Sequence, residues 1–179
     1  MAQLAISKAR LFLIAAAVVL LSIALRLFLP PSVSSSAQLS TSDEAIERGE
    51  YLVIAGGCIS CHRGEEDEES FIGGLALETD FGTFFAPNIT PDMETGIGSW
   101  QAEDFLLALK HGRKPGGSFY YPAFPFRAYA GLSDQDAVDI GSYLMSLDPK
   151  ANSVPDAQTP LWLNRWAMAG WNLMADISE

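Results

Sequence analysis

The N-terminal part of the chain contains its longest apolar stretch. Lys8 and Arg10 precede an apolar run over Leu11–Leu25, which is interrupted at Arg26. Basic residues ahead of such a run place its N-terminus in the cytoplasm, so the rest of the chain is expected in the periplasm or another extracytoplasmic space. The run is long enough for an inner-membrane anchor if Arg26 reaches the outer interface. A cleaved signal peptide is the alternative; we favour an anchor over residues 1–30.

The pattern beyond the apolar run predicts helices joined by long loops. A segment rich in proline and serine, residues 31–41, predicts a flexible linker. Apolar residues then recur at helical spacing in four segments, each starting at a capping residue. The expected helices are 42–55, 100–111, 133–147 and 160–175; a capping box over Thr41–Glu44 starts the first, and Ser99, Ser133 and Thr159 cap the others. Residues 71–98 predict irregular chain, so an all-α domain is expected over 42–150, followed by a C-terminal extension over 151–179.

Charge restricts the partners of this exported part. The chain has 179 residues, 49% of them hydrophobic, which suits one modest domain with an appendage. Every one of the 22 acidic residues lies at or beyond Asp43, and the part after residue 30 has a net charge of −14. Such a body repels phosphate backbones and excludes nucleic acid as a partner. A redox partner with a basic docking face is its natural complement.

A short cysteine motif carries the candidate chemistry. Cys58, Cys61 and His62 form a C-x-x-C-H sequence, and the chain has no other cysteine. This is the attachment sequence of c-type haem. Two thiols three positions apart can add to the two vinyl groups at one porphyrin edge, and His62 can bind the iron as a neutral imidazole whose other nitrogen donates to a carbonyl. The three short helices expected within residues 42–150 supply little core for this length, which also indicates a non-protein group at the centre.

The sequence around this motif resembles class I c-type cytochromes, and more narrowly the first haem domain of cytochrome c subunits of bacterial membrane-associated dehydrogenases. The matching stretches are 48–53, 58–62, 87–92, 94–100, 121–125 and 132–134, and the segment 162–173 resembles the chain after the first haem domain of dihaem relatives. The resemblance implies a class I cytochrome c fold with one haem. It also implies that Gly49 lies at a close helix crossing with Tyr143, and that Asn88, Thr90 and Trp100 hold the haem propionates.

The sixth iron ligand is where the chain departs from the family. Relatives of this kind carry a methionine at the position of Phe124 or of Leu132, and neither residue is methionine here. His111 and Met93 remain as candidates, and an iron with five ligands is a third possibility. A methionine–histidine pair normally keeps the iron closed to small ligands, so this departure bears directly on function.

Three functional hypotheses follow. The leading one is a non-enzymatic, membrane-tethered one-electron carrier, or the electron-transfer subunit of a dehydrogenase or respiratory complex. A haem protein whose open distal site binds a small ligand or peroxide is the second, and an assembly subunit is the third. The C-terminal extension carries three of the four tryptophans, Trp162, Trp166 and Trp171, on an expected Trp-rich helix. These side chains are expected to pack on the domain, on a membrane partner, or at the bilayer interface.

Overall fold

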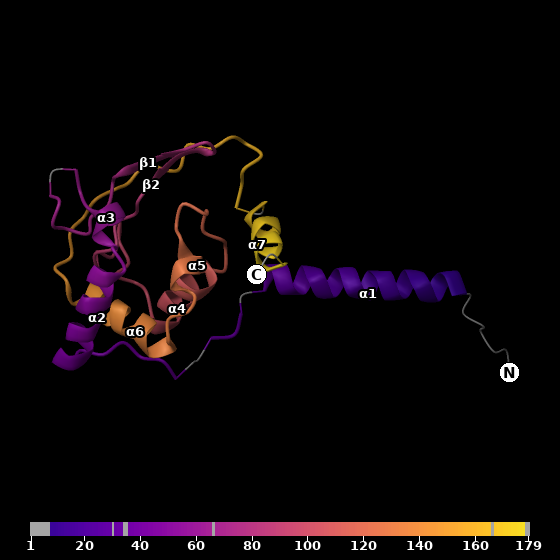
Figure 1. Cartoon of the computed structure of the whole chain (residues 1–179), viewed down its shortest axis with the longest axis horizontal. Helices are drawn as coiled ribbons and strands as arrows, with labels where there is room; N and C mark the ends of the chain where they lie inside the picture. The colour runs from indigo at the N-terminus through magenta and orange to yellow at the C-terminus, as the bar shows by residue number, and fades with distance from the viewer. Residues whose placement is uncertain (1–7, 30, 34–35, 66, 166, 178–179) are drawn as a thin grey trace.

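The architecture is a small helical domain with one long helix projecting from it. A computed structural model describes residues 8–29, 31–33, 36–65, 67–165 and 167–177. Helices α2 to α6 and the hairpin β1–β2 make up the domain, and α1 extends away from it next to α7 (Figure 1). The fold is therefore mostly helical, as the sequence predicts.

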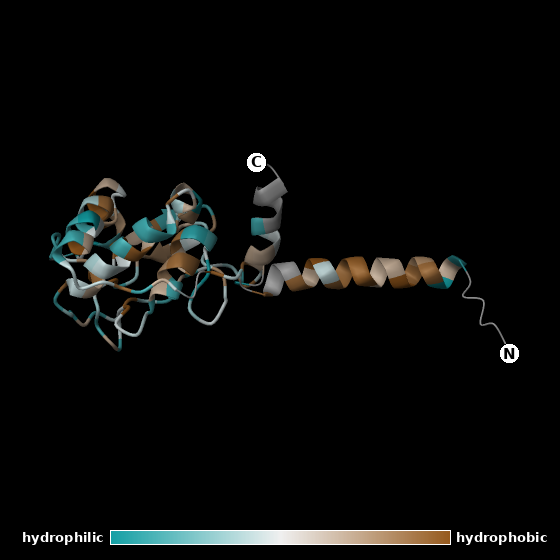
Figure 2. Cartoon of the chain, turned by 90° about the horizontal axis from the view of Figure 1, so that it is seen from below, coloured by the Kyte–Doolittle hydropathy of each residue, from teal (hydrophilic) through white to brown (hydrophobic). Residues whose placement is uncertain are grey.

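Helix α1, Lys8–Phe28, is apolar on nearly all sides (Figure 2). Its 21 residues span about 30 Å at 1.5 Å per residue, which matches the hydrocarbon thickness of a bilayer. The window Lys8–Leu25 has a mean hydropathy of 2.2 and is not buried by the rest of the protein. By length and composition α1 can cross a membrane, and both a membrane anchor and a signal sequence have these properties.

Helices α2, Asp43–Ala55, and α6, Asp134–Ser146, cross closely at the centre of the domain. A Cβ built on Gly49 would lie 2.8 Å from the Cβ of Tyr143 and closer still to the carbonyl of Asp139, so only glycine permits this approach. Arg48 Nε donates to the fully buried carboxylate of Asp139 at 2.8 Å and ties the same two helices together. The expected crossing at Gly49 is confirmed.

The helix boundaries depend on capping residues. Ser133 caps α6 as expected and forms a reciprocal capping box with Asp136. The cap of α2 is Ser42, which accepts from the Ala45 amide, one residue after Thr41, where the expected capping box begins. Helix α4, Ala102–His111, begins later than predicted, because Gln101 and Asp104 form its capping box. Ser99 is therefore not its cap. Gly112 ends α4 in the left-handed conformation, with φ of 60°.

The segment expected to be irregular contains an antiparallel hairpin. Strands β1, Ala76–Thr79, and β2, Gly82–Phe85, pair with Ala76 opposite Phe85 and Thr79 opposite Gly82. Gly82 has a φ of 121°, which a residue with a side chain rarely adopts. The prediction of an all-α domain is wrong at this hairpin.

The C-terminal extension also differs from its prediction. Helix α7, Ala167–Ile177, begins well after Thr159, which does not cap it. Trp162 precedes the helix and Trp171 lies within it, whereas Trp166 is outside the described residues. Leu163, Met168 and Ala169 are buried with the hairpin residue Phe84, so this end of the chain packs on the domain. Among the described residues α7 carries one tryptophan, Trp171, so the expected Trp-rich C-terminal helix is not shown.

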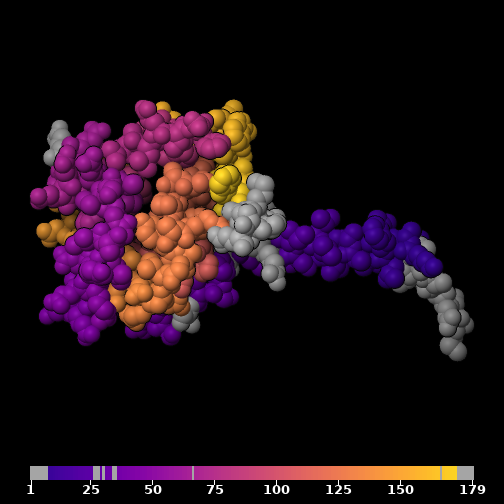
Figure 3. Space-filling view, viewed as in Figure 1, coloured from indigo at the N-terminus to yellow at the C-terminus, as the bar shows by residue number. Residues whose placement is uncertain are grey.

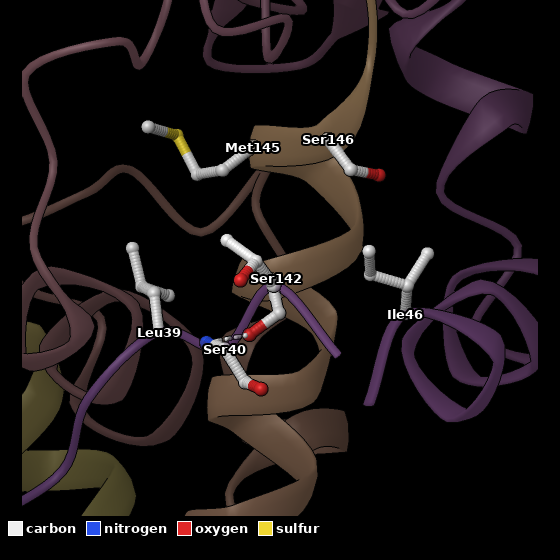
Figure 4. Close-up of a pocket in the computed structure, with 7 residues that line it drawn as sticks. Leu39, Ser40, Ile46, Ser142, Met145 and Ser146 are labelled. Atoms are coloured by element: carbon white, nitrogen blue, oxygen red, sulfur yellow. Dashed lines mark hydrogen bonds between the residues drawn. The ribbon is translucent and has the colours of Figure 1, made fainter. Parts of the chain in front are cut away.

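The chain between α1 and α2 is packed along part of its length. Val33, Ala37 and Leu39 contact the core formed by α4 and α6, and the Ser40 amide donates to Ser142 Oγ at 2.9 Å. A shallow pocket lies beside this contact and is lined by residues of the linker, α2 and α6, including Leu39, Ile46, Ser142 and Met145 (Figure 4). The linker 31–41, which was expected to be flexible, is therefore packed on the domain at these residues.

Candidate functional site

A tight turn after α2 brings the two cysteines onto one helical turn. Gly57 has a φ of 67°, which reverses the chain after α2. Helix α3, Ile59–His62, follows, and the amides of Cys61 and His62 both bond to the Cys58 carbonyl, at 3.3 and 3.0 Å. Residues three apart on such a turn share a face. The two thiols therefore lie together at the surface of the domain.

Both thiols are free, and both are partly exposed. Burial raises the pKa of the Cys58 thiol, and its side chain packs on the apolar core that includes Val53 and Phe105. Free, accessible thiols in this spacing fit thioether formation with the two vinyl groups of one haem.

His62 is oriented by a single backbone acceptor. Its Nδ1 lies 2.8 Å from the carbonyl oxygen of Pro87, and a carbonyl can only accept, so Nδ1 carries the proton. Burial lowers the pKa of His62, and the Pro87 hydrogen bond opposes this with a smaller effect. The neutral ring then has its lone pair on Nε2, available to a metal. The carbonyl partner predicted for this histidine is therefore present, and it belongs to Pro87.

The loop after Pro87 is held by a network centred on Asn88. Asn88 is 2% exposed, and its Nδ2 donates to the Lys150 carbonyl at 2.7 Å and to Thr95 Oγ1 at 3.0 Å. Its Oδ1 accepts from the amide and the hydroxyl of Thr90, at 2.9 and 2.8 Å. Asn88 and Thr90 thus fix the loop that carries the Pro87 carbonyl, a positioning role that the sequence did not suggest. Trp100 packs edge-on against Phe105, with ring centroids 5.2 Å apart.

An aromatic group lies beside the thiols. It consists of Tyr120, Phe124 and Tyr129, the last of which belongs to the short helix α5, Phe126–Tyr129. Tyr129 donates to the Gly56 carbonyl at 2.9 Å and stacks on Phe124, which in turn contacts Tyr120 edge-on. Burial raises the pKa of Tyr129, and the two neighbouring cysteines add to this increase. Tyr129 was not singled out from the sequence, although this residue lies between Phe124 and Leu132, the two positions at which relatives carry the methionine.

The two candidates for the sixth ligand have different surroundings, and which of them binds the iron stays a prediction. Met93 is 69% exposed and lies beside Gly98. His111 is the last residue of α4. Burial is the main cause that lowers the pKa of His111; the charges of Lys110 and Arg113 also lower it, and that of Asp134 raises it. The donors that meet at the motif are the two thiols and the imidazole, and this set fits one covalent haem c.

The chain resembles known proteins over most of its length. The Cytochrome c family matches residues 46–148. A diheme cytochrome c-type protein of Cereibacter sphaeroides is 41% identical over 89% of this chain and 56% of its own length. The gluconate 2-dehydrogenase cytochrome c subunit of Pantoea cypripedii is 39% identical, over 78% of this chain and 32% of its own length. The cytochrome c subunit of the quinone alcohol dehydrogenase of Gluconobacter oxydans is 38% identical, with 78% and 30% covered.

This chain spans about half the length of the first relative and about a third of the other two. The match to the family covers α2 to α6, and with them the motif, the loop that holds Pro87 and the helix crossing at Gly49. Its single C-x-x-C-H sequence provides for one covalent haem. The chain therefore belongs to the cytochrome c family and is an electron-transfer protein with one haem c.

Proposed function

We propose that this chain is a membrane-tethered, periplasmic one-electron carrier that serves a dehydrogenase or another respiratory complex. The observation that carries the proposal is the His62–Pro87 hydrogen bond at 2.8 Å, one turn after two free thiols. Haem bound there supplies a one-electron couple. The chain holds it covalently through Cys58 and Cys61. The fixed Pro87 carbonyl holds the imidazole ring with Nε2 free, while burial keeps the ring neutral.

The tether is α1. Its apolar surface and its length match a bilayer, and Lys8 and Arg10 precede the apolar run. With the N-terminus in the cytoplasm, the haem domain faces the periplasm. Cytochrome c subunits of dehydrogenases among the relatives support assignment to such a complex.

The partner is expected to dock on the acidic surface beside the motif. Glu65, Glu68 and Glu69 are exposed in the loop that follows α3. A basic face on the donor or acceptor would be attracted to this loop and guided to the haem edge. Asn88 and Thr90 contribute by holding the Pro87 loop, and they and Trp100 remain our candidates for contact with the propionates.

A second candidate function rests on the aromatic group beside the thiols. Phe124 and Tyr129 occupy the loop in which relatives carry a methionine, and neither side chain offers sulfur or imidazole nitrogen to iron. A haem with five ligands in this domain would bind a small molecule on its distal side.

The optical spectrum of the purified haem protein, oxidised and reduced, with and without carbon monoxide, separates the two functions. A low-spin spectrum unchanged by carbon monoxide supports the carrier and shows that a sixth protein ligand exists. The variants Met93→Ala and His111→Ala then identify that ligand, since only its loss converts the iron to high spin. A high-spin spectrum that shifts with carbon monoxide contradicts a closed carrier and supports ligand binding.

A further inference from the structure

Four large apolar side chains are exposed where the hairpin meets the C-terminal extension. They are Phe81 at the hairpin tip, Leu161, Trp162 and Trp171, and we call them the apolar rim. Leu161 is 99% exposed and Trp162 is 65% exposed, although both belong to a segment that packs on the domain. Exposure of this kind is costly in water, because large apolar side chains gain stability when they are buried.

The backbone holds the rim together. Thr83 of β2 pairs with Gln158, with hydrogen bonds of 3.1 and 2.8 Å in the two directions. This pairing sets the hairpin tip beside the start of the segment that carries Leu161 and Trp162. Leu163, Met168 and Ala169 turn inward from the same segment and are buried with Phe84 and Phe119. The segment thus has a buried side that fixes it and an exposed side that nothing in the described structure covers.

The rim lies at the end of the domain from which α1 departs. Helix α7, which carries Trp171, contacts α1. Figure 1 shows α7 beside the end of α1 that is nearer to the domain. Figure 3 shows the yellow C-terminal segment on the side of the domain from which α1 projects. If α1 crosses a bilayer, this side of the domain faces the membrane surface.

Two cations accompany the rim in an otherwise acidic domain. Arg165 follows Trp162 by three residues, donates to the Phe119 carbonyl at 2.9 Å, and lies over the Tyr121 ring at 4.7 Å. Lys114 lies close enough to Arg165 for that charge to lower its pKa, after the larger effect of burial. Aromatic side chains next to Lys and Arg are the composition of surfaces that sit at the level of lipid headgroups.

We propose that the apolar rim inserts into the interfacial layer of the bilayer that α1 crosses, with Lys114 and Arg165 at the phospholipid headgroups. The inference rests on the proposed tether and adds a second membrane contact to it. Two contacts fix the orientation of the domain, whereas a tether alone leaves it free to rotate. The motif helix α3 lies at the other end of the domain from α7 (Figure 1), so this orientation keeps the haem site turned toward soluble or laterally docked partners.

Photo-crosslinking from the lipid tests the proposal on the full haem-loaded chain. The protein is reconstituted into vesicles of phosphatidylcholine and phosphatidylglycerol that contain a phospholipid with a photoactivatable acyl chain. Irradiation and trypsin digestion give separate peptides for the α1 run (11–26), for Leu161 and Trp162 (151–165) and for α6 (128–150). We expect lipid adducts on 11–26 and 151–165, with several-fold fewer on 128–150. The double variant Leu161→Ser, Trp162→Ser should lose most of the adducts on 151–165.

A matched variant and the internal peptides make the outcomes distinct. Tyr51→Ser with Ile54→Ser removes two large side chains that are also well exposed, 71% and 69%, but lie on α2. This variant should leave the adducts on 151–165 unchanged. If 11–26 carries adducts but 151–165 carries no more of them than 128–150, the contact between the rim and the bilayer is contradicted and the tether is still supported. Adducts on 151–165 that survive the Leu161→Ser, Trp162→Ser exchange would also overturn it. Loss of adducts from 11–26 itself would refute the tether, and the rim proposal with it.

Discussion

At the scale of single residues, the site depends on groups that orient His62 rather than on the motif alone. The C-x-x-C-H spacing identifies the thiols and the imidazole, because that chemistry is local in the sequence. The Pro87 carbonyl lies 25 residues away and Tyr129 lies farther still, so only the folded chain brings them to the motif. Asn88 was expected at a propionate, and its contacts show in addition how the Pro87 loop is held.

Gly49 gives the sharpest prediction at this scale. A methyl group at Gly49 overlaps the Asp139 carbonyl and the Tyr143 Cβ, so Gly49→Ala must push α2 away from α6. Overpacking of this kind is expected to lower the free energy of unfolding by about 2–3 kcal/mol. Gly131→Ala is the matched control, because nothing lies within 4 Å of the Cβ that it adds. Equal stability of the two variants in denaturant titration would contradict the crossing.

At the scale of secondary-structure elements, the starts of helices are predicted correctly from the sequence only where the capping residue is easy to recognise. Helices α2 and α6 follow their predicted ranges, because Ser42 and Ser133 precede regular apolar spacing. The start of α4 was misplaced because Gln101 with Asp104 competes with Ser99 and is a less common capping pair. The hairpin was missed because its strands are only four residues long and its two-residue loop, Asp80–Phe81, lacks the usual Asn-Gly signal.

Replacing Ser133 and Ser99 by alanine, one at a time, tests whether Gln101 rather than Ser99 caps α4. Ser133→Ala removes a side chain that accepts from the Asp136 amide at 3.1 Å, and should cost about 1 kcal/mol of stability. Ser99→Ala should be nearly neutral, because Gln101 caps α4. Thermal unfolding followed by circular dichroism measures both. A loss in Ser99→Ala as large as that in Ser133→Ala would restore Ser99 as the cap.

An ion pair joins the acidic loop after α3 to the chain after α6, and it should be visible in the pH dependence of stability. Lys150 Nζ lies 2.7 Å from Asp67 Oδ2, and this hydrogen bond is the main cause that lowers the pKa of Asp67. A carboxylate whose pKa is lowered by folding stabilises the protein above its unfolded pKa of about 4, and this contribution is lost as the pH falls through the native value.

Asp67→Asn is therefore expected to lower the thermal midpoint slightly at neutral pH and to match the parent protein at acid pH. Both side chains are nearly half exposed, so the difference is small. The paired measurement is the thermal midpoint of the two proteins from neutral pH down through the acid range in which Asp67 of the native protein becomes protonated. A difference that persists unchanged at the acid end would contradict the ion pair as its cause.

At the scale of the whole molecule, the docking that we propose for a basic partner depends on the distribution of charge over the domain. Replacing Glu65, Glu68 and Glu69 with lysine reverses the exposed charge beside α3 without touching the core. We expect slower association with a basic partner at low ionic strength, and a smaller difference as salt screens the charges. Stopped-flow electron transfer with a basic redox protein measures this rate. The triple variant Glu44→Lys, Glu47→Lys, Glu103→Lys, at exposed sites on α2 and α4, controls for net charge, and equal slowing in both would contradict a local docking site.

The most direct test of the whole account is a spectroelectrochemical titration of the full chain, followed by haem quantification on the denatured protein. We expect one reversible one-electron transition for each chain, from a haem that stays attached after denaturation through Cys58 and Cys61. A haem that dissociates on denaturation would contradict the covalent site. A covalent haem without a reversible one-electron transition would contradict the function proposed for it.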